Sequence, residues 1–222
     1  MSAVIVLAAG AGRRLGGVAK AALRLADGRS YLEAIRDIGR AAGVTDWVVV
    51  CGPPHEQVTR DLSHALGLPC SRNSDPTRGM ASSVAIGFAH ALTNWPHHRA
   101  ALLWPVDHPA VQSTTVRALI DQSVAAGAVI PRYADRGGHP SAFGRAVWPA
   151  LASCHQLPQG ARSVVQQLEQ ATVAGASPVS RPQFDDPGLV RDVDTPDALS
   201  RMNGFRPSEP AGTAAGSRSC GD

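Results

Sequence analysis

Short runs of apolar residues alternate along the chain with longer segments in which apolar positions recur every three or four residues. The runs predict buried strands, and the longer segments predict amphipathic helices. By this pattern we expect strands at 3–8, 46–51, 100–106 and 127–132, and helices at 30–42, 55–66, 80–93 and 113–126. The strand runs are apolar on both faces, as in a sheet that helices cover on both sides. The chain is therefore expected to form an α/β domain with a largely parallel central sheet.

The alternation weakens after residue 133. There the sequence predicts a helix at 161–171, a short strand near 188–191 and a last helix starting at Pro196. The final segment, 205–222, is rich in Pro, Gly, Ser and Ala and has almost nothing to bury, so we expect it to be disordered. The folded domain is expected to span residues 1–204.

Composition, charge and cysteine spacing argue against several classes of protein. A chain of 222 residues with 44% hydrophobic content is long enough for one large core. Its N-terminal apolar run is only about six residues long, shorter than the roughly 7–15 of a secretory signal, and no stretch approaches the roughly 18 apolar residues of a membrane span. The four cysteines lie singly, and the net charge of +3 shows no basic run. We expect a soluble, cytoplasmic protein that binds neither membrane nor nucleic acid.

The first expected strand leads directly into a glycine-rich segment, and residues 4–20 read VIVLAAGAGRRLGGVAK. Glycines allow backbone N–H groups to approach a polyphosphate, and cations such as Arg14 and Lys20 neutralise its charge. The segment lacks the GK[ST] ending of a P-loop and the GxGxxG spacing of a dinucleotide site. From these residues alone, a strand that turns through glycines with solvated arginines remains the alternative.

Two further segments place carboxylates after apolar runs. Asp107 ends the run LLWPV, and Asp192 and Asp194 follow LVR before Thr195 and Pro196. In an open α/β sheet, ligands gather at the carboxyl ends of the strands, so these carboxylates are candidate metal ligands. A turn aspartate, or the ordinary start of a helix before proline, is the alternative for each. The spacing does not decide whether Asp192 is a ligand or a supporting residue.

Five segments resemble one known family, in the order in which that family has them. LAAGAGRRLGGVAK resembles the LAAGxGxRMGxxxK signature of the MobA-like nucleotidyltransferases. NSDPTRGMASSVAIG, beginning at Asn73, resembles the Asn…Gly-Met-x-Ser-Ser…Gly segment of that family. VDHP, GGHPSAFG and DVDTPDAL resemble its GDxP, GHPxxF and DIDTPED segments. Val106 and His108 depart from the usual pattern of the family.

The resemblance implies a Rossmann-like, GT-A-like three-layer α/β/α nucleotidyltransferase domain. The form Ala8-Ala9-Gly10 together with GHPxxF points to the molybdenum cofactor cytidylyltransferase (MocA-like) branch. That branch transfers CMP from CTP to the phosphate of molybdenum-bound molybdopterin, which gives molybdopterin cytosine dinucleotide and pyrophosphate. The expected cofactor is Mg²⁺. The expected partners are CTP, a molybdopterin-type acceptor and a recipient molybdoenzyme or its chaperone.

The resemblance also implies roles for individual residues. Asp107 and Asp194 would hold Mg²⁺, while Arg14 and Lys20 would bind the triphosphate. The residues expected to bind the nucleotide are Leu7, Ala8, Ala9, Gly10, Gly12 and Ser83; those expected on the acceptor side are His108, His139 and Pro140. Two alternatives stay open. One is a transferase of the same fold that acts on a sugar phosphate or phospho-alcohol, and the other is a non-catalytic carrier of the cofactor.

Overall fold

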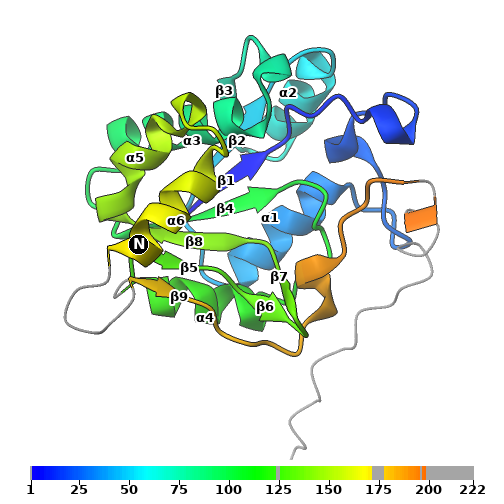
Figure 1. Ribbon diagram of the computed structural model, residues 1–222. Coiled ribbons are helices and arrows are strands. Elements are labelled where there is room, and N and C mark those ends of the chain that lie inside the picture. The colour runs from blue at the N-terminus through cyan, green and yellow to red at the C-terminus, as the bar shows by residue number, and fades with distance from the viewer. Residues whose placement is uncertain (1, 124–125, 172–177, 196, 199–222) are drawn as a thin grey trace, which may run out of the picture.

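The computed structural model describes residues 2–123, 126–171, 178–195 and 197–198 (Figure 1). A seven-stranded sheet runs through its middle, with helices on both faces. The strands are β1 (Ala3–Leu7), β2 (Asp46–Cys51), β3 (Cys70–Arg72), β4 (Ala100–Pro105), β5 (Ala128–Val129), β8 (Ser141–Gly144) and β9 (Val179–Ser180), while β6 (Arg132–Tyr133) pairs with β7 (Arg136–Gly137) apart from this sheet. The α-helices are α1 (Tyr31–Ala41), α2 (Glu56–Ala65), α3 (Met80–Asn94), α4 (Ser113–Ser123), α5 (Trp148–Ala152) and α6 (Ala161–Gln170). Single 3₁₀ turns are η1 (Arg13–Leu15), η2 (Lys20–Ala22), η3 (Pro76–Arg78), η4 (Arg145–Val147), η5 (Cys154–Gln156) and η6 (Pro187–Val190).

The strand order of the sheet is β3-β2-β1-β4-β8-β5-β9. The pairs β1–β2, β2–β3, β1–β4 and β5–β9 are parallel, whereas β8 runs antiparallel to both β4 and β5. The expectation of a mostly parallel sheet is confirmed. β1 lies between β2 and β4, so Leu7 is paired with Val50 on one side and with Pro105 on the other.

Each face of the sheet has its own apolar core, because successive side chains of a strand point to opposite faces. On one face Val4 and Val6 of β1 pack with residues of α1 and α4. On the other face Ile5 and Leu7 pack with residues of α3, α5 and α6. In Figure 1, α5 and α6 lie over one face and α1 lies behind the other. These three layers are the α/β/α arrangement that the sequence predicts.

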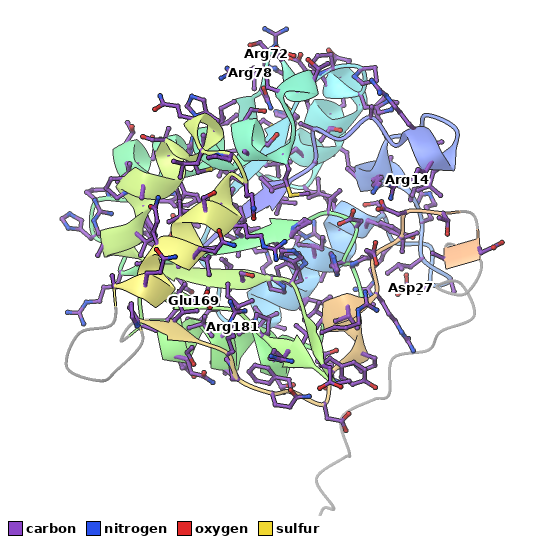
Figure 2. All side chains as sticks on the ribbon, viewed as in Figure 1. Arg14, Asp27, Arg72, Arg78, Glu169 and Arg181 are labelled. Carbon is purple, nitrogen blue, oxygen red and sulfur yellow. The ribbon has the colours of Figure 1, made fainter. Side chains whose placement is uncertain are left out.

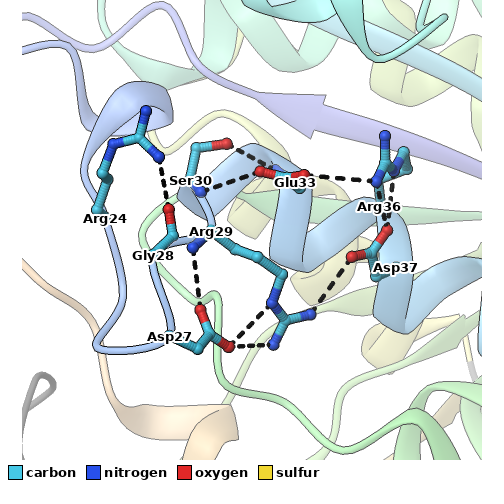
Figure 3. A network of polar contacts seen from close by, with 8 residues as sticks. All are labelled: Arg24, Asp27, Gly28, Arg29, Ser30, Glu33, Arg36 and Asp37. Carbon is cyan, nitrogen blue, oxygen red and sulfur yellow. Dashed lines mark hydrogen bonds and ion pairs between the residues drawn. The ribbon is translucent and has the colours of Figure 1, made fainter.

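A polar network fixes the segment between η2 and α1 (Figure 3). Ser30 caps α1 by accepting a hydrogen bond from the Glu33 backbone N–H, and the Glu33 carboxylate accepts one from the Ser30 N–H. The Arg29 guanidinium contacts both Asp27 and Asp37. The network holds the turn of residues 24–30 against α1.

The strand expected near 188–191 is wrong, because residues Pro187–Val190 form the 3₁₀ turn η6. The buried Asp186 accepts a hydrogen bond from the Gly188 N–H and so caps this turn, while Pro187 supplies a φ suited to its first position. Leu189 is buried by packing and not by a sheet ladder. The apolar run therefore reflects burial alone, without strand pairing.

One other expectation differs from the structure in extent. The strand expected at 127–132 is limited to β5 and followed by β6, since Pro131 has no N–H with which to continue a ladder. β8 was not predicted from the sequence, as it has only four residues in a segment that reads as a loop.

The last helix expected from Pro196 falls mostly outside the described residues, and the domain end at 204 and the tail 205–222 fall entirely outside them. Within the described part of the chain, no helix is both long and apolar enough to cross a membrane.

Candidate active site

The glycine-rich loop after β1 is built from left-handed backbone positions. Gly12 has a φ of +59°, and a Cβ there would lie 2.2 Å from the Val18 carbonyl oxygen. Only glycine fits such a position without strain. The Gly12 carbonyl accepts hydrogen bonds from the N–H groups of Leu15 and Gly17, which closes the loop around η1. This closure leaves the first part of the loop free to face a ligand.

A cleft of about 560 Å³ opens over this loop. Its lining comprises Ala9, Gly10, Ala11, Gly12, Arg13, Arg14, Lys20, Pro53, Pro54, Pro76, Thr77 and Asp194. Among the described residues, no acceptor is found for the backbone N–H groups of residues 9–12. Free N–H groups beside two arginines and a lysine form an anion-binding surface. The sequence did not single out Pro53 or Pro54, which only the folded chain brings here, whereas Pro76 and Thr77 lie in η3, within the family-like segment that begins at Asn73.

Lys20 joins the two predicted carboxylates. Its Nζ donates to Asp107 Oδ2 at 2.8 Å and also to Asp194 Oδ1. Burial lowers the pKa of Lys20, but the charges and hydrogen bonds of Asp107 and Asp194 more than offset burial, so the pKa lies above its ordinary value. The ammonium group therefore stays charged at neutral pH, at the carboxyl end of β4.

Backbone contacts bring Asp194 to this point from the far end of the chain. The Val193 N–H donates to the Asp107 carbonyl at 3.1 Å, and the Val193 side chain is fully buried. Upstream, Asp186 accepts a hydrogen bond from the Gln112 N–H and ties η6 to the start of α4. A Cβ at Gly188 would lie 2.2 Å from the Ala110 carbonyl oxygen, so the two segments pack closely. Figure 1 shows the segment after η6, in orange, beside the early part of the chain, in blue.

Arg14 and Asp192 lie at the border of the site. Arg14 Nη1 contacts Asp194 Oδ2 at 3.3 Å, and the Arg14 side chain, labelled in Figure 2, is 76% exposed and lines the first cleft. Asp192 is exposed, and within the described residues it makes no hydrogen bond or ion pair. Of the two carboxylates of this segment, the structure brings Asp194 and not Asp192 to Lys20.

A second cleft of about 250 Å³ continues from the first. Leu7, Ala8 and Ser83 line it together with Ala9, Gly10, Lys20, Pro76, Gly79, Met80, Pro105, Val106 and Asp107. The buried Asn73 side chain donates to the hydroxyl oxygens of Ser82 and Ser83, each at 2.9 Å, and so fixes the start of α3. The two clefts together contain every residue for which the resemblance implies a nucleotide, triphosphate or metal contact.

The residues expected on the acceptor side lie close together, but only His139 lines a cleft. His108 is buried, and its ring lies 5.2 Å from that of His139 in a T-shaped contact. Burial lowers the pKa of both rings, in the case of His139 to about 4, so both are neutral at pH 7. His139 lines a third cleft, of about 640 Å³, whereas His108 and the buried Pro140 line none of the three. His108 packs under the site and does not open into it.

The two carboxylates that contact Lys20 are suitable ligands for a Mg²⁺ ion. Asp107 and Asp194 provide carboxylate oxygens, the hard ligands that Mg²⁺ prefers, and both already converge on one positive charge. Magnesium is commonly held by one or two carboxylates, with phosphates and waters in its other positions. Within the described residues no three His, Cys, Asp or Glu side chains gather around one point. The protein alone would therefore leave most of the coordination to substrate.

The MobA-like NTP transferase domain family matches residues 4–172 of the chain. The chain belongs to this family. The match spans the glycine-rich loop, Lys20 and Asp107, and it ends before Asp194. Among proteins with curated descriptions, none matches the chain.

Solved structures agree with the family. Rv0371c from Mycobacterium tuberculosis H37Rv is 30% identical, with 92% of this chain and 97% of that chain covered and a TM-score of 0.76. A complex of Rv0371c with manganese is 27% identical, with 91% and 98% covered and a TM-score of 0.70. A molybdopterin-guanine dinucleotide biosynthesis protein A from Archaeoglobus fulgidus is 20% identical, with 91% and 97% covered and a TM-score of 0.62, and it shares the fold. The protein is a nucleotidyltransferase.

Proposed function

We propose that this nucleotidyltransferase transfers CMP from CTP to the terminal phosphate of molybdenum-bound molybdopterin. The observation that carries the proposal is the junction of Lys20 with Asp107 and Asp194, directly beside a glycine loop with free N–H groups. The choice of CTP and of this acceptor rests on the AAG form of the loop and on GGHPSAFG, which resemble the cytidylyltransferase branch. The manganese complex of Rv0371c supports a divalent metal in the family.

The reaction requires an anionic phosphate to approach an anionic triphosphate. A phosphate oxygen of the acceptor attacks the α-phosphorus of CTP, a new P–O bond forms, and the bond to the β-phosphate breaks to release pyrophosphate. Catalysis of such a step consists mainly of positioning and of charge neutralisation. A phosphate nucleophile is already ionised at neutral pH, so no side chain has to remove a proton.

Different residues of the two clefts would position the substrates and neutralise their charge. The free N–H groups of residues 9–12 bind the triphosphate, and the exposed Arg14 neutralises the departing pyrophosphate. Lys20 places its charge between Asp107 and Asp194, beside the site of attack. Asp107 and Asp194 would hold Mg²⁺, which would supply a Lewis acid for the α-phosphate. Ser83, held by Asn73, contacts the cytidine.

Pyrophosphate release tests this function. Purified protein is incubated with Mg²⁺ and each of CTP, GTP, ATP and UTP, with and without molybdenum-loaded molybdopterin. Release only from CTP plus the cofactor is expected. Release with GTP overturns the choice of base, and release with a sugar phosphate or phospho-alcohol in place of the cofactor overturns the choice of acceptor. Binding of CTP without release in any mixture contradicts catalysis and identifies a carrier.

Asp107→Asn tests the metal site. The variant keeps the shape of the side chain but loses its charge, so we expect kcat to fall at least about 100-fold while the melting temperature changes little. Asp121→Asn, an exposed carboxylate on α4, is the matched control and retains full activity. Asp192→Asn is expected to lose less than about tenfold, since Asp192 does not reach Lys20. An unchanged rate in Asp107→Asn contradicts the metal-ligand assignment.

A further inference from the structure

The third cleft lies between α3, α6 and the middle of the sheet. Its volume of about 640 Å³ falls within the range of small-molecule sites. Apolar side chains form most of its walls, namely Val84 of α3, Leu103 of β4, Ile130, Phe143 of β8 and Val165 of α6. Such walls favour a ligand with a flat or apolar body over a bare triphosphate.

Met80 joins this cleft to the second one. It is the residue that the linings of both clefts share, and it begins α3. Its side chain is 62% exposed, and Val58 is the other large apolar residue exposed in the described part of the chain. A thioether is flexible and polarisable, and it makes favourable contacts with aromatic rings. Met80 is therefore placed to contact a ligand on either side.

Two arginines line the third cleft, and they differ in their partners. Arg181 Nη2 contacts Glu169 Oε1 at 2.6 Å, and Figure 2 shows the two residues side by side. Arg162, in the first turn of α6, has no side-chain partner within the described residues. An unpaired guanidinium beside apolar walls favours an anionic group, which it can bind through two N–H donors.

We propose that Arg162 and Met80 select the acceptor. Arg162 binds an anionic group of the acceptor in the third cleft, and Met80 separates the acceptor from the nucleotide while touching both. The inference rests on the proposed function. The reacting phosphate must lie near Lys20 and Asp107, which line the second cleft, whereas Arg162 lines the third. The acceptor class is therefore a molecule with a flat ring system and an anionic group besides the reacting phosphate.

Steady-state kinetics test this division of roles. Arg162→Gln is expected to raise KM for the acceptor about tenfold, with kcat and KM for CTP within about twofold, because a charged hydrogen bond to the acceptor alone is lost. Arg162→Lys keeps the charge and restores part of the affinity. Arg40→Gln, an exposed arginine in the last turn of α1, is the matched control. An unchanged acceptor KM in Arg162→Gln overturns the role of Arg162.

Substitution of Met80 is expected to change a different set of kinetic constants. Met80→Ala should raise KM for both CTP and the acceptor by about three- to tenfold, while Met80→Leu stays close to the wild type. Val58→Ala, the exposed apolar residue on α2, is the control for a general effect of truncation. A rise in one KM alone would contradict a wall shared by the two substrates.

A binding experiment separates this inference from the proposed function. 6-Carboxypterin is a flat, fluorescent and anionic probe, and 6-methylpterin is its neutral counterpart. Quenching titrations are expected to show weaker binding of 6-carboxypterin to Arg162→Gln than to the wild type by at least about fivefold, with 6-methylpterin unaffected. This result without any pyrophosphate release would leave the inference standing and the proposed function wrong. Pyrophosphate release as proposed, with equal probe binding in both proteins, would overturn the inference alone.

Discussion

The phenol of Tyr31 is fully buried, and its hydroxyl has no hydrogen-bond partner within the described residues. An unpaired buried hydroxyl costs free energy, because it has lost its bonds to water. Tyr31→Phe removes that group and leaves the ring in place. We expect the free energy of unfolding to rise by about 1 kcal/mol in urea titrations at pH 7. A decrease of that size would show that the hydroxyl is paired in solution.

The same residue gives a pH dependence with a definite sign. Burial, together with the charge of Asp107, raises the pKa of Tyr31 from 10.0 to about 12 in the folded protein. Folding therefore favours the neutral phenol, and this contribution is complete below pH 10 and lost as the pH rises towards 12. Between these values the advantage of Tyr31→Phe over the wild type should widen, by up to about 1.4 kcal/mol for each pH unit. Tyr133→Phe is the control, and parallel curves for wild type and Tyr31→Phe would contradict the shift.

Some residues of the candidate and proposed sites could be found from the sequence, and others could not. Lys20, Asp107 and Asp194 each follow an apolar run or a glycine loop, so their types and positions were visible before the fold was known. Met80 and Arg162 carry no such mark, because an exposed methionine and an arginine on a helix are common in any sequence. Their placement depends on how α3 and α6 pack beside β8, and that packing involves residues far apart in the chain.

The first turn of α1 offers a test of local stability. Ser30 and Glu33 satisfy each other's backbone N–H groups, and Ser30 is buried. Ser30→Ala removes one of these bonds, so we expect the free energy of unfolding to fall by about 1 kcal/mol. Ser153→Ala is a matched control, because Ser153 precedes η5 without a side-chain cap and should cost less than about 0.5 kcal/mol. Equal losses in the two variants would show that the capping box adds nothing.

The apolar pattern of the sequence predicted an element correctly where the apolar residues are buried and also recur with the period of that element. The segments that form β1, β2 and β4 are continuously apolar, and those that form α1 and α3 have apolar residues at helical spacing. These elements were therefore predicted close to their observed bounds. It failed at Leu189 and its neighbours, where the apolar side chains are buried in a 3₁₀ turn that Asp186 caps. It also missed β8, since four residues are too few to show a period of two. In both cases tertiary packing, and not local pattern, decides the structure.

The order of the strands determines where the site lies. From β1 the chain proceeds outward to β2 and β3 and then returns to β4 on the other side of β1. The strand order reverses at this point, and an open α/β sheet has its ligand-binding crevice at such a reversal. The glycine loop follows β1 and Asp107 follows β4, so neighbouring strands deliver both halves of the site. Only Asp194 must come from outside the sheet, and its segment is attached through Val193.

Coupled binding of metal and nucleotide is therefore expected to stabilise the whole molecule. By the proposed metal site, Asp107 and Asp194 would hold a metal better when phosphates complete its coordination, and the triphosphate would bind better when the metal offsets its charge. At about 100 times its Kd a ligand adds about 2.7 kcal/mol, which for a chain of this size raises the melting temperature by roughly 5–10 °C. We expect CTP with Mg²⁺ to give such a shift, and either alone to give clearly less, in thermal unfolding followed by circular dichroism. In Asp107→Asn the effect of Mg²⁺ on the CTP shift should disappear, whereas Asp121→Asn should keep it. An equal CTP shift in the wild type with and without Mg²⁺ would mean that the nucleotide binds through the loop and Arg14 alone, with the carboxylates serving only to hold Lys20.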